Sequence, residues 1–240
     1  LLVALATAQA SRGMLASAAG GIAEAQILYR DLGLRPARAI ALANLAEILL
    51  LQGDVGSAWQ AASDSLAEAA AAGHRVGDVT ARDVRAGIAL AVGAWADARP
   101  EVAAALAGAR AQKGGLPGPL CHAARLALVD GDLRAVLKLT EEAEAVGKSG
   151  DPEGLRHTAR VLRAIAFARQ GAEAPARSGI ELATAQVGAL PMYRRVSVLL
   201  DLAEAAAAIG ETALALEHFR LVTQIGSMRG FRLATLDGMV

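Results

Sequence analysis

A glycine between two small residues recurs along this chain at nearly constant intervals. Around Gly53, one alanine lies seven residues earlier and another lies five residues later, and five other glycines have similar neighbours. The six sets are Gly13, Gly20 and Ala25; Ala46, Gly53 and Ala58; Ala86, Gly93 and Ala98; Ala124, Gly131 and Val136; Ala164, Gly171 and Ala176; and Ala203, Gly210 and Ala215. The central glycines are 33, 40, 38, 40 and 39 residues apart. This regularity predicts a stack of six repeats.

Each repeat is expected to form two helices joined at its glycine. Apolar residues at helical spacing precede the glycine, as Leu45, Ile48 and Leu49 do, and a second segment of similar character follows it. A glycine can close the first helix in the left-handed conformation. Asp54 and Asp132 come directly after their glycines and can cap the next helix. The glycine and the residue that follows it therefore predict a tight turn between two antiparallel helices.

The flanking small residues are interpreted as packing contacts between the two helices. Small side chains let the helix backbones approach closely, and a larger side chain there would cost roughly 1 to 3 kcal/mol by overpacking. Composition agrees, because the chain is 54% hydrophobic but only 3% aromatic, with Ala and Leu prevailing. The sequence thus predicts an all-α protein.

Between the repeats lie short connections rich in glycine and proline. They are expected at residues 33–37, 73–78, 113–119, 147–154 and 188–191. None is long or polar enough to mark a domain boundary, so residues 1–240 are predicted to form one domain. Its repeats are placed at about 1–36, 37–75, 76–115, 116–152, 153–190 and 191–230. The first 14 residues and residues 230–240 resemble cut edges, which suggests a piece of a longer protein.

The pairs Leu45-Ala46 and Leu202-Ala203, the turn glycine and the following alanine together resemble the tetratricopeptide repeat (TPR). This resemblance implies a right-handed α-solenoid of six TPR-like hairpins, with about 12 to 13 helices. The period exceeds the usual repeat of about 34 residues, and most aromatic positions of the family hold Ala, Leu or Val. The longer period is similar to the degenerate repeats of large bacterial signalling proteins, including maltose-regulator-like and LuxR-type activators.

Charge, hydropathy and cysteine content limit the partners and the compartment that fit this chain. Lys plus Arg and Asp plus Glu number 24 each, so no net field attracts nucleic acid or an anionic membrane. The apolar run at 45–51 is interrupted by Glu47 and is too short to span a membrane. The single cysteine, Cys121, cannot form an internal disulfide and fits a reducing compartment. We therefore expect a cytoplasmic protein.

No pattern for catalysis, a metal or a cofactor is found. The four histidines fall in different repeats and never at metal-ligand spacing. The segment 145–149 ends like a phosphate-binding loop but lacks its leading glycine and the preceding strand. The serines have no nucleophile-elbow context. The sequence thus predicts a non-catalytic protein without cofactor.

If the TPR resemblance holds, helix positions 3, 6, 10 and 13 before each turn glycine line a concave groove. The candidate partner-binding residues are Glu47, Leu50, Asp83, Leu90, Arg125, Leu128, Ile165, Glu204 and Ala207. This lining has few charges and none of the Asn and Lys with which TPR domains grip a terminal carboxylate. A helix, an extended apolar segment or another domain of the same polypeptide fits better, with Arg125 meeting an acidic group.

Two functions remain open from sequence. One is the regulatory or sensor arm of a larger bacterial signalling or transcriptional regulator, which binds a protein or peptide segment or another ligand. The alternative is a freestanding adaptor or assembly scaffold. Both use the protein as a binding module, in agreement with the usual role of helical solenoids.

Overall fold

The computed structural model describes residues 1–112, 116–146 and 154–229. These residues form twelve α-helices and one short 3-10 helix, without a strand in the described part. They divide into two compact units, each described here by itself. Unit 1 contains α1 (Leu2–Ser11), α2 (Leu15–Asp31), α3 (Arg35–Leu51), α4 (Val55–Ala71), α5 (Arg75–Ala91) and α6 (Trp95–Arg110). Unit 2 contains α7 (Pro117–Val129), α8 (Leu133–Val146), α9 (Leu155–Arg169), α10 (Glu173–Gln186), η2 (Val187–Ala189), α11 (Met192–Ala208) and α12 (Thr212–Arg229).

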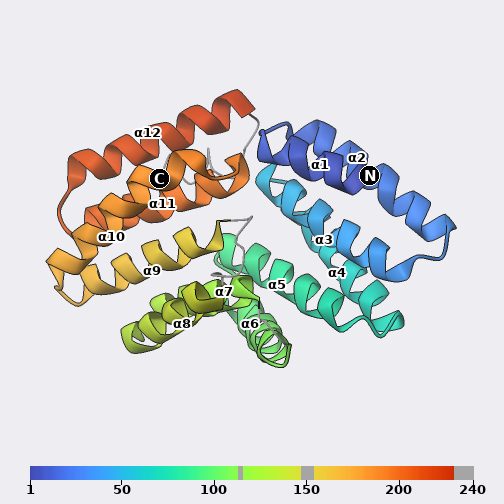
Figure 1. The fold of residues 1–240 in the computed structure, drawn as a ribbon, viewed down its shortest axis with the longest axis horizontal. Coiled ribbons are helices and arrows are strands. Elements are labelled where there is room, and N and C mark those ends of the chain that lie inside the picture. Colours follow the sequence, from blue (N-terminus) through green and yellow to red (C-terminus); the bar gives the residue numbers. More distant parts are fainter. Residues whose placement is uncertain (113–115, 147–153, 230–240) are drawn as a thin grey trace. The chain divides into compact units, whose positions relative to one another are not determined.

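In each unit, helices that follow one another in sequence lie side by side (Figure 1). The pairs α1/α2, α3/α4 and α5/α6 are the hairpins of unit 1, and α7/α8, α9/α10 and α11/α12 are those of unit 2. The all-α fold and the six hairpins predicted from sequence are confirmed. That the two units form one continuous solenoid domain stays a prediction.

The hairpin turns use glycine in the left-handed region. At Gly53, φ is 78°, the Gly53 N–H donates to the Leu50 carbonyl at 2.8 Å, and the Asp54 N–H donates to the Leu49 carbonyl at 3.0 Å. These two hydrogen bonds close the helix, and they satisfy backbone carbonyls that have no partner further along it. The next helix begins at once, because the Asp54 carboxylate accepts from the Ser57 N–H at 3.1 Å. Asp132 caps α8 in the same way, through the Ala135 N–H at 3.0 Å.

The first repeat was predicted in the wrong register. Gly20 lies inside α2, and the first hairpin turns at Gly13, whose φ is 78°. The corrected set is therefore Ala6, Gly13 and Ala18, with both alanines buried. Gly20 fitted the pattern only because small residues are abundant in this chain, so a helical glycine can acquire the same neighbours by chance.

The connections between hairpins in unit 1 are also shorter than the sequence suggested. Residues 33–37 and 73–78 were expected to be linkers, but α3 begins at Arg35 and α5 at Arg75. Pro36 fits the first turn of α3, where its missing N–H is no loss. In unit 1, glycines in the left-handed region therefore recur every 20 residues, at positions 13, 33, 53, 73 and 93, where one helix ends and the next begins. Residues 117–119 of a further expected linker likewise begin α7, whereas residues 113–115 and 147–153, which include part of the loop-like segment 145–149, lie outside the described residues.

The small residues that flank the turn glycines are buried in every hairpin. Their side chains lie between the paired helices, where the largest exposed fraction is 4%, at Ala215. The other members are Ala6, Ala18, Ala46, Ala58, Ala86, Ala98, Ala124, Val136, Ala164, Ala176 and Ala203. This burial is what a packing role between the paired helices requires. In the described residues, no helix is long and apolar enough to cross a membrane.

Replacing Ala86 by leucine should destabilise the protein by about 1 to 3 kcal/mol, because Ala86 is fully buried and the added atoms would push α5 away from α6. Ala72→Leu is the control, since Ala72 ends α4 outside the small columns and is half-buried. Urea unfolding followed by circular dichroism measures both. Equal midpoints for the two variants would contradict the packing role.

Candidate binding face of the first helices

The first helices of successive hairpins contact one another as well as their own partners. In unit 1, α3 packs against α5, and in unit 2, α9 packs against both α7 and α11. In each unit, we call the side of these first helices that is turned away from their second helices the first-helix face of that unit, and all nine candidate residues named from sequence lie on these helices. A solenoid uses such a face for binding because it extends over several repeats.

The nine candidate residues differ greatly in exposure. Glu47, Glu204 and Ala207 are exposed. Leu50, Asp83 and Arg125 are half-buried, and Leu50 packs against the core that α3, α4 and α5 share. Leu90, Leu128 and Ile165 are buried, with Ile165 fully inaccessible. The structure therefore leaves six of the nine side chains within reach of solvent, and their role in binding stays a prediction.

Arg125 on α7 makes the best-formed ion pair of the face. Its two terminal nitrogens donate to the two carboxylate oxygens of Asp201 on α11, at 2.8 and 2.7 Å. This forked geometry matches both groups and is roughly twice as strong as a neutral hydrogen bond. Because α9 lies between α7 and α11 in the order of hairpins, the pair joins two hairpins that are not neighbours. It ties the first and the last hairpin of unit 2 together.

Arg169 adds a second bridge beside the first. At the end of α9, its guanidinium donates to the Leu128 carbonyl of α7 at 2.9 Å and to the Glu204 carboxylate of α11 at 2.7 Å. The Leu128 carbonyl also accepts from the turn glycine Gly131, so Arg169 complements the negative end of α7. The two arginines thus meet two carboxylates on one face of α11.

The charges of this cluster act on one another. The Asp201 carboxylate holds the pKa of the Arg125 guanidinium above its ordinary value, and Glu204 contributes in the same direction. Asp201 and Glu204 lie three residues apart in α11, on the same side of the helix. We call Arg125, Arg169, Asp201 and Glu204 the charge cluster.

Sequence reasoning named Arg125 and Glu204 but missed Asp201 and Arg169. Asp201 lies nine residues before its turn glycine and Arg169 only two, so neither falls on a position that the TPR resemblance assigns to the groove. A signal was present nonetheless. Asp201 is an acidic residue among the apolar residues of α11, and a buried carboxylate requires a cationic partner.

Other ion pairs tie first and second helices together. Arg38 on α3 donates to Glu68 on α4 at 2.6 Å, and Arg163 on α9 lies 2.9 Å from Glu144 on α8. Arg85 on α5 contacts Glu101 on α6 at 3.0 Å, and its guanidinium lies 4.5 Å from the ring centroid of Trp59 on α4. These contacts fix neighbouring helices and do not converge on a shared site.

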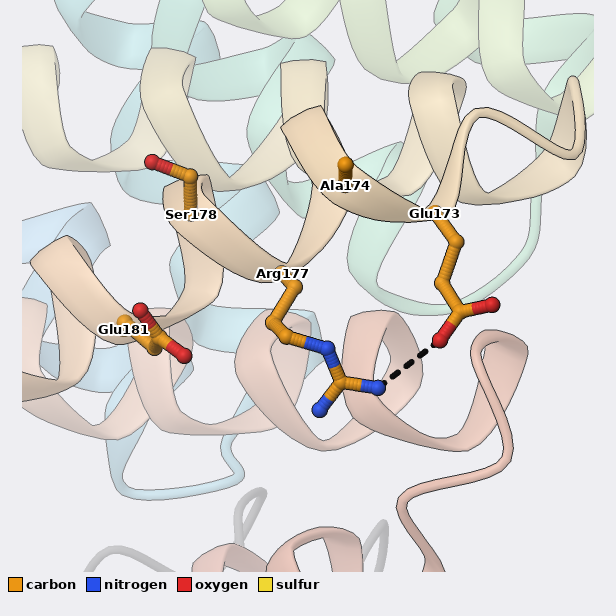
Figure 2. A pocket seen from close by; sticks show the side chains of 5 residues that line it. All are labelled: Glu173, Ala174, Arg177, Ser178 and Glu181. Atoms are coloured by element: carbon orange, nitrogen blue, oxygen red, sulfur yellow. Dashed lines mark hydrogen bonds and ion pairs between the residues drawn. The ribbon is translucent and has the colours of Figure 1, made fainter.

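A shallow pocket of about 380 Å³ lies on a second helix instead. Its lining comes from α10 alone, namely Glu173, Ala174, Arg177, Ser178 and Glu181 (Figure 2). Arg177 lies between Glu173, at 2.8 Å, and Glu211, to which it also donates. None of the nine candidate residues lines this pocket. Among the described residues, no group of three or more His, Cys, Asp and Glu could hold a metal ion.

The described helices form an all-helical fold of TPR-like hairpins. Solved structures with a similar fold include the crystal structure of a Rap protein complexed with competence and sporulation factor. That match has a TM-score of 0.69 and 13% sequence identity, and covers 98% of this chain and 71% of the Rap chain. At this identity, the likeness shows the fold alone. No family model matches the sequence, and no curated protein sequence matches it.

The two carboxylates of the charge cluster should differ in their effect on stability. Asp201→Asn leaves a bidentate guanidinium without its counter-charge and should cost about 1 to 3 kcal/mol. Glu204→Gln weakens an exposed pair and should cost less than about 1 kcal/mol. Urea unfolding of both variants measures the difference. Equal losses would show that the Arg125 bridge does not hold unit 2 together.

His218 on α12 makes the stability depend on pH. Its ring is buried, the Thr184 hydroxyl on α10 lies 3.4 Å from Nε2, and Nδ1 has no hydrogen-bond partner among the described residues. Burial lowers the pKa of His218 below its ordinary value of 6.5, against an opposing effect of Glu217. The folded state therefore binds fewer protons than the unfolded chain, so acidification destabilises it.

We expect the free energy of unfolding to fall as the pH drops below about 6.5, and His218→Leu to flatten this part of the profile. His157→Gln is the control, because the His157 ring already has a partner in Gln186 at 2.9 Å. Denaturant melts at pH values from 7.5 to 5 test this. A profile unchanged by His218→Leu would show that another group causes the acid loss.

Proposed function

We propose that this chain is a non-catalytic binding module that holds a protein or peptide segment on its first-helix face. We further propose that it serves as the regulatory arm of a larger bacterial signalling or transcriptional regulator in the cytoplasm, of the maltose-regulator-like or LuxR type. The module binds while other domains act, and it needs no cofactor or metal for that role.

The charge cluster is the observation that carries this proposal. The equivalents of Arg125 in the neighbouring hairpins are Gly87 and Ile165, and the equivalents of Asp201 are Leu162 and His122. These positions therefore do not need a charge for the repeats to pack. A charged pair that the repeat pattern does not require, on the face that solenoids use for binding, indicates recognition.

The comparison with the Rap protein supports a peptide or protein as the partner. That protein shares the fold and is described as complexed with competence and sporulation factor. In each unit, the first helices offer side chains that an extended segment can contact. Exposed Glu47 and half-buried Leu50 lie on α3, and the arginines of the charge cluster lie on α7 and α9.

Direct nucleic-acid binding is not part of the proposal. The chain carries equal numbers of acidic and basic residues, and Arg38, Arg85 and Arg163 are each engaged by a glutamate. Affinity for nucleic acid depends mainly on uncompensated positive charge that can neutralise phosphates.

A tagged version of the protein should copurify with a protein partner from its own cells. Arg125→Glu should abolish this copurification, because the reversed charge repels Asp201 and opens the charge cluster. Glu47→Lys should weaken it by reversing an exposed charge on the first-helix face of unit 1. Quantitative mass spectrometry of the eluates provides the measurement.

Asp64→Lys is the matched control, since Asp64 is an exposed acidic residue on the second helix α4. Circular dichroism checks that every variant is folded. Retention of the same partner by both first-helix variants would contradict the binding face. An intact reading frame without an NTPase or DNA-binding domain would contradict the regulatory arm and favour the freestanding adaptor.

A further inference from the structure

The two ion pairs of the charge cluster are not equally firm. The Asp201 side chain is 5% exposed and the Arg125 side chain 32%, so this pair is largely withdrawn from water. The side chains of Arg169 and Glu204 are 42% and 47% exposed. An exposed pair contributes little to stability, whereas removing one partner of a buried pair is far more costly. Of the two carboxylates in the cluster, Glu204 is therefore the one whose ion pair breaks at the lower cost in free energy.

The cations of the cluster are oriented for an incoming anion. Arg125 uses two of its five N–H donors on Asp201, which fixes the plane of its guanidinium. Arg169 is held at one nitrogen by the Leu128 carbonyl and has its other terminal nitrogen on Glu204. If Glu204 swings away into solvent, both guanidiniums keep their positions. A carboxylate between them would then meet two arginines that are already in place.

We propose that Glu204 holds the place of a partner's carboxylate, and that the first-helix face of unit 2 binds an acidic peptide segment by exchanging Glu204 for an aspartate or glutamate of that segment. This inference rests on the proposed binding function and specifies the chemistry of the partner. Asp201 acts as a positioning residue for Arg125, and Arg169 is the main contact for the incoming carboxylate. The exchange leaves the net charge of the bound cluster unchanged.

The charge balance favours an acidic segment over a basic one. A basic side chain would have to reach Asp201, which is buried behind Arg125, or would gain only the exposed Glu204. An acidic side chain meets the two guanidiniums from the solvent side. Arginine clusters are a recurrent means of recognising acidic motifs.

The test uses the full chain and a fluorescent peptide of about eight residues that alternates glutamate with alanine, measured by anisotropy at low ionic strength. Glu204→Gln should tighten binding about two- to fivefold, because the competing carboxylate is lost. Arg169→Gln should weaken binding about tenfold or more. A peptide with lysine in place of each glutamate should bind more weakly to every form.

Glu173→Gln is the matched control. Glu173 is also exposed and paired with an arginine at 2.8 Å, but it lies on the second helix α10. The inference is overturned if Glu173→Gln tightens binding as much as Glu204→Gln does, if the lysine peptide binds better, or if no form binds the acidic peptide. Arg169→Gln stands in for Arg125→Gln, because loss of Arg125 would leave Asp201 buried and unpaired.

Failure of this inference and failure of the proposed function are distinguishable. A protein partner that copurifies and is lost on Arg125→Glu would support the binding module. If Glu204→Gln then leaves the affinity for the acidic peptide unchanged, the carboxylate exchange is wrong. If no protein partner copurifies while the peptide responds as described, the site binds acidic groups but the partner is not a cellular protein. Salt adds a further check, since the gain from Glu204→Gln should shrink as ionic strength rises.

Discussion

The close approach of paired helices at small side chains is the constraint on which this fold depends. Because alanine side chains are short, the two helices make contact only when their backbones are close. A wider spacing would lose the van der Waals contacts along the whole interface. With little aromatic mass in the core, each helix gains stability from many small contacts with its neighbours rather than from a few large side chains. The left-handed glycines allow this close approach, because each lets the chain reverse its direction within the three residues between paired helices.

Much of the fold was predictable because its determinants are local. The turn glycine, the following cap and the alanines on either side all lie within 13 consecutive residues, as in Ala46 to Ala58. The register of the first hairpin was not predictable from these marks alone, since Gly20 satisfied them inside a helix. The 20-residue spacing of Gly13, Gly33 and Gly53 would have resolved it, because one helix plus one turn fills that length in unit 1.

The candidate site was predictable only in part, for a physical reason. A family pattern can assign Arg125 to a face, but it cannot identify a partner that is 76 residues away. The burial of Leu90, Leu128 and Ile165 likewise depends on how neighbouring hairpins pack, which no single repeat encodes. What sequence does reveal is the oddity of Asp201, a carboxylate in an apolar helix that must find a cation.

The Arg125 to Asp201 bridge has a consequence for how the molecule folds. Most contacts in each unit join helices that are adjacent in sequence, so they form quickly and need little loop closure. The bridge spans 76 residues and requires three hairpins of unit 2 to be in place first. We therefore expect it to form late, and a contact that forms after the rate-limiting step slows unfolding while leaving the folding rate nearly unchanged. On this expectation, Arg125 and Asp201 affect how slowly unit 2 unfolds rather than how fast it assembles.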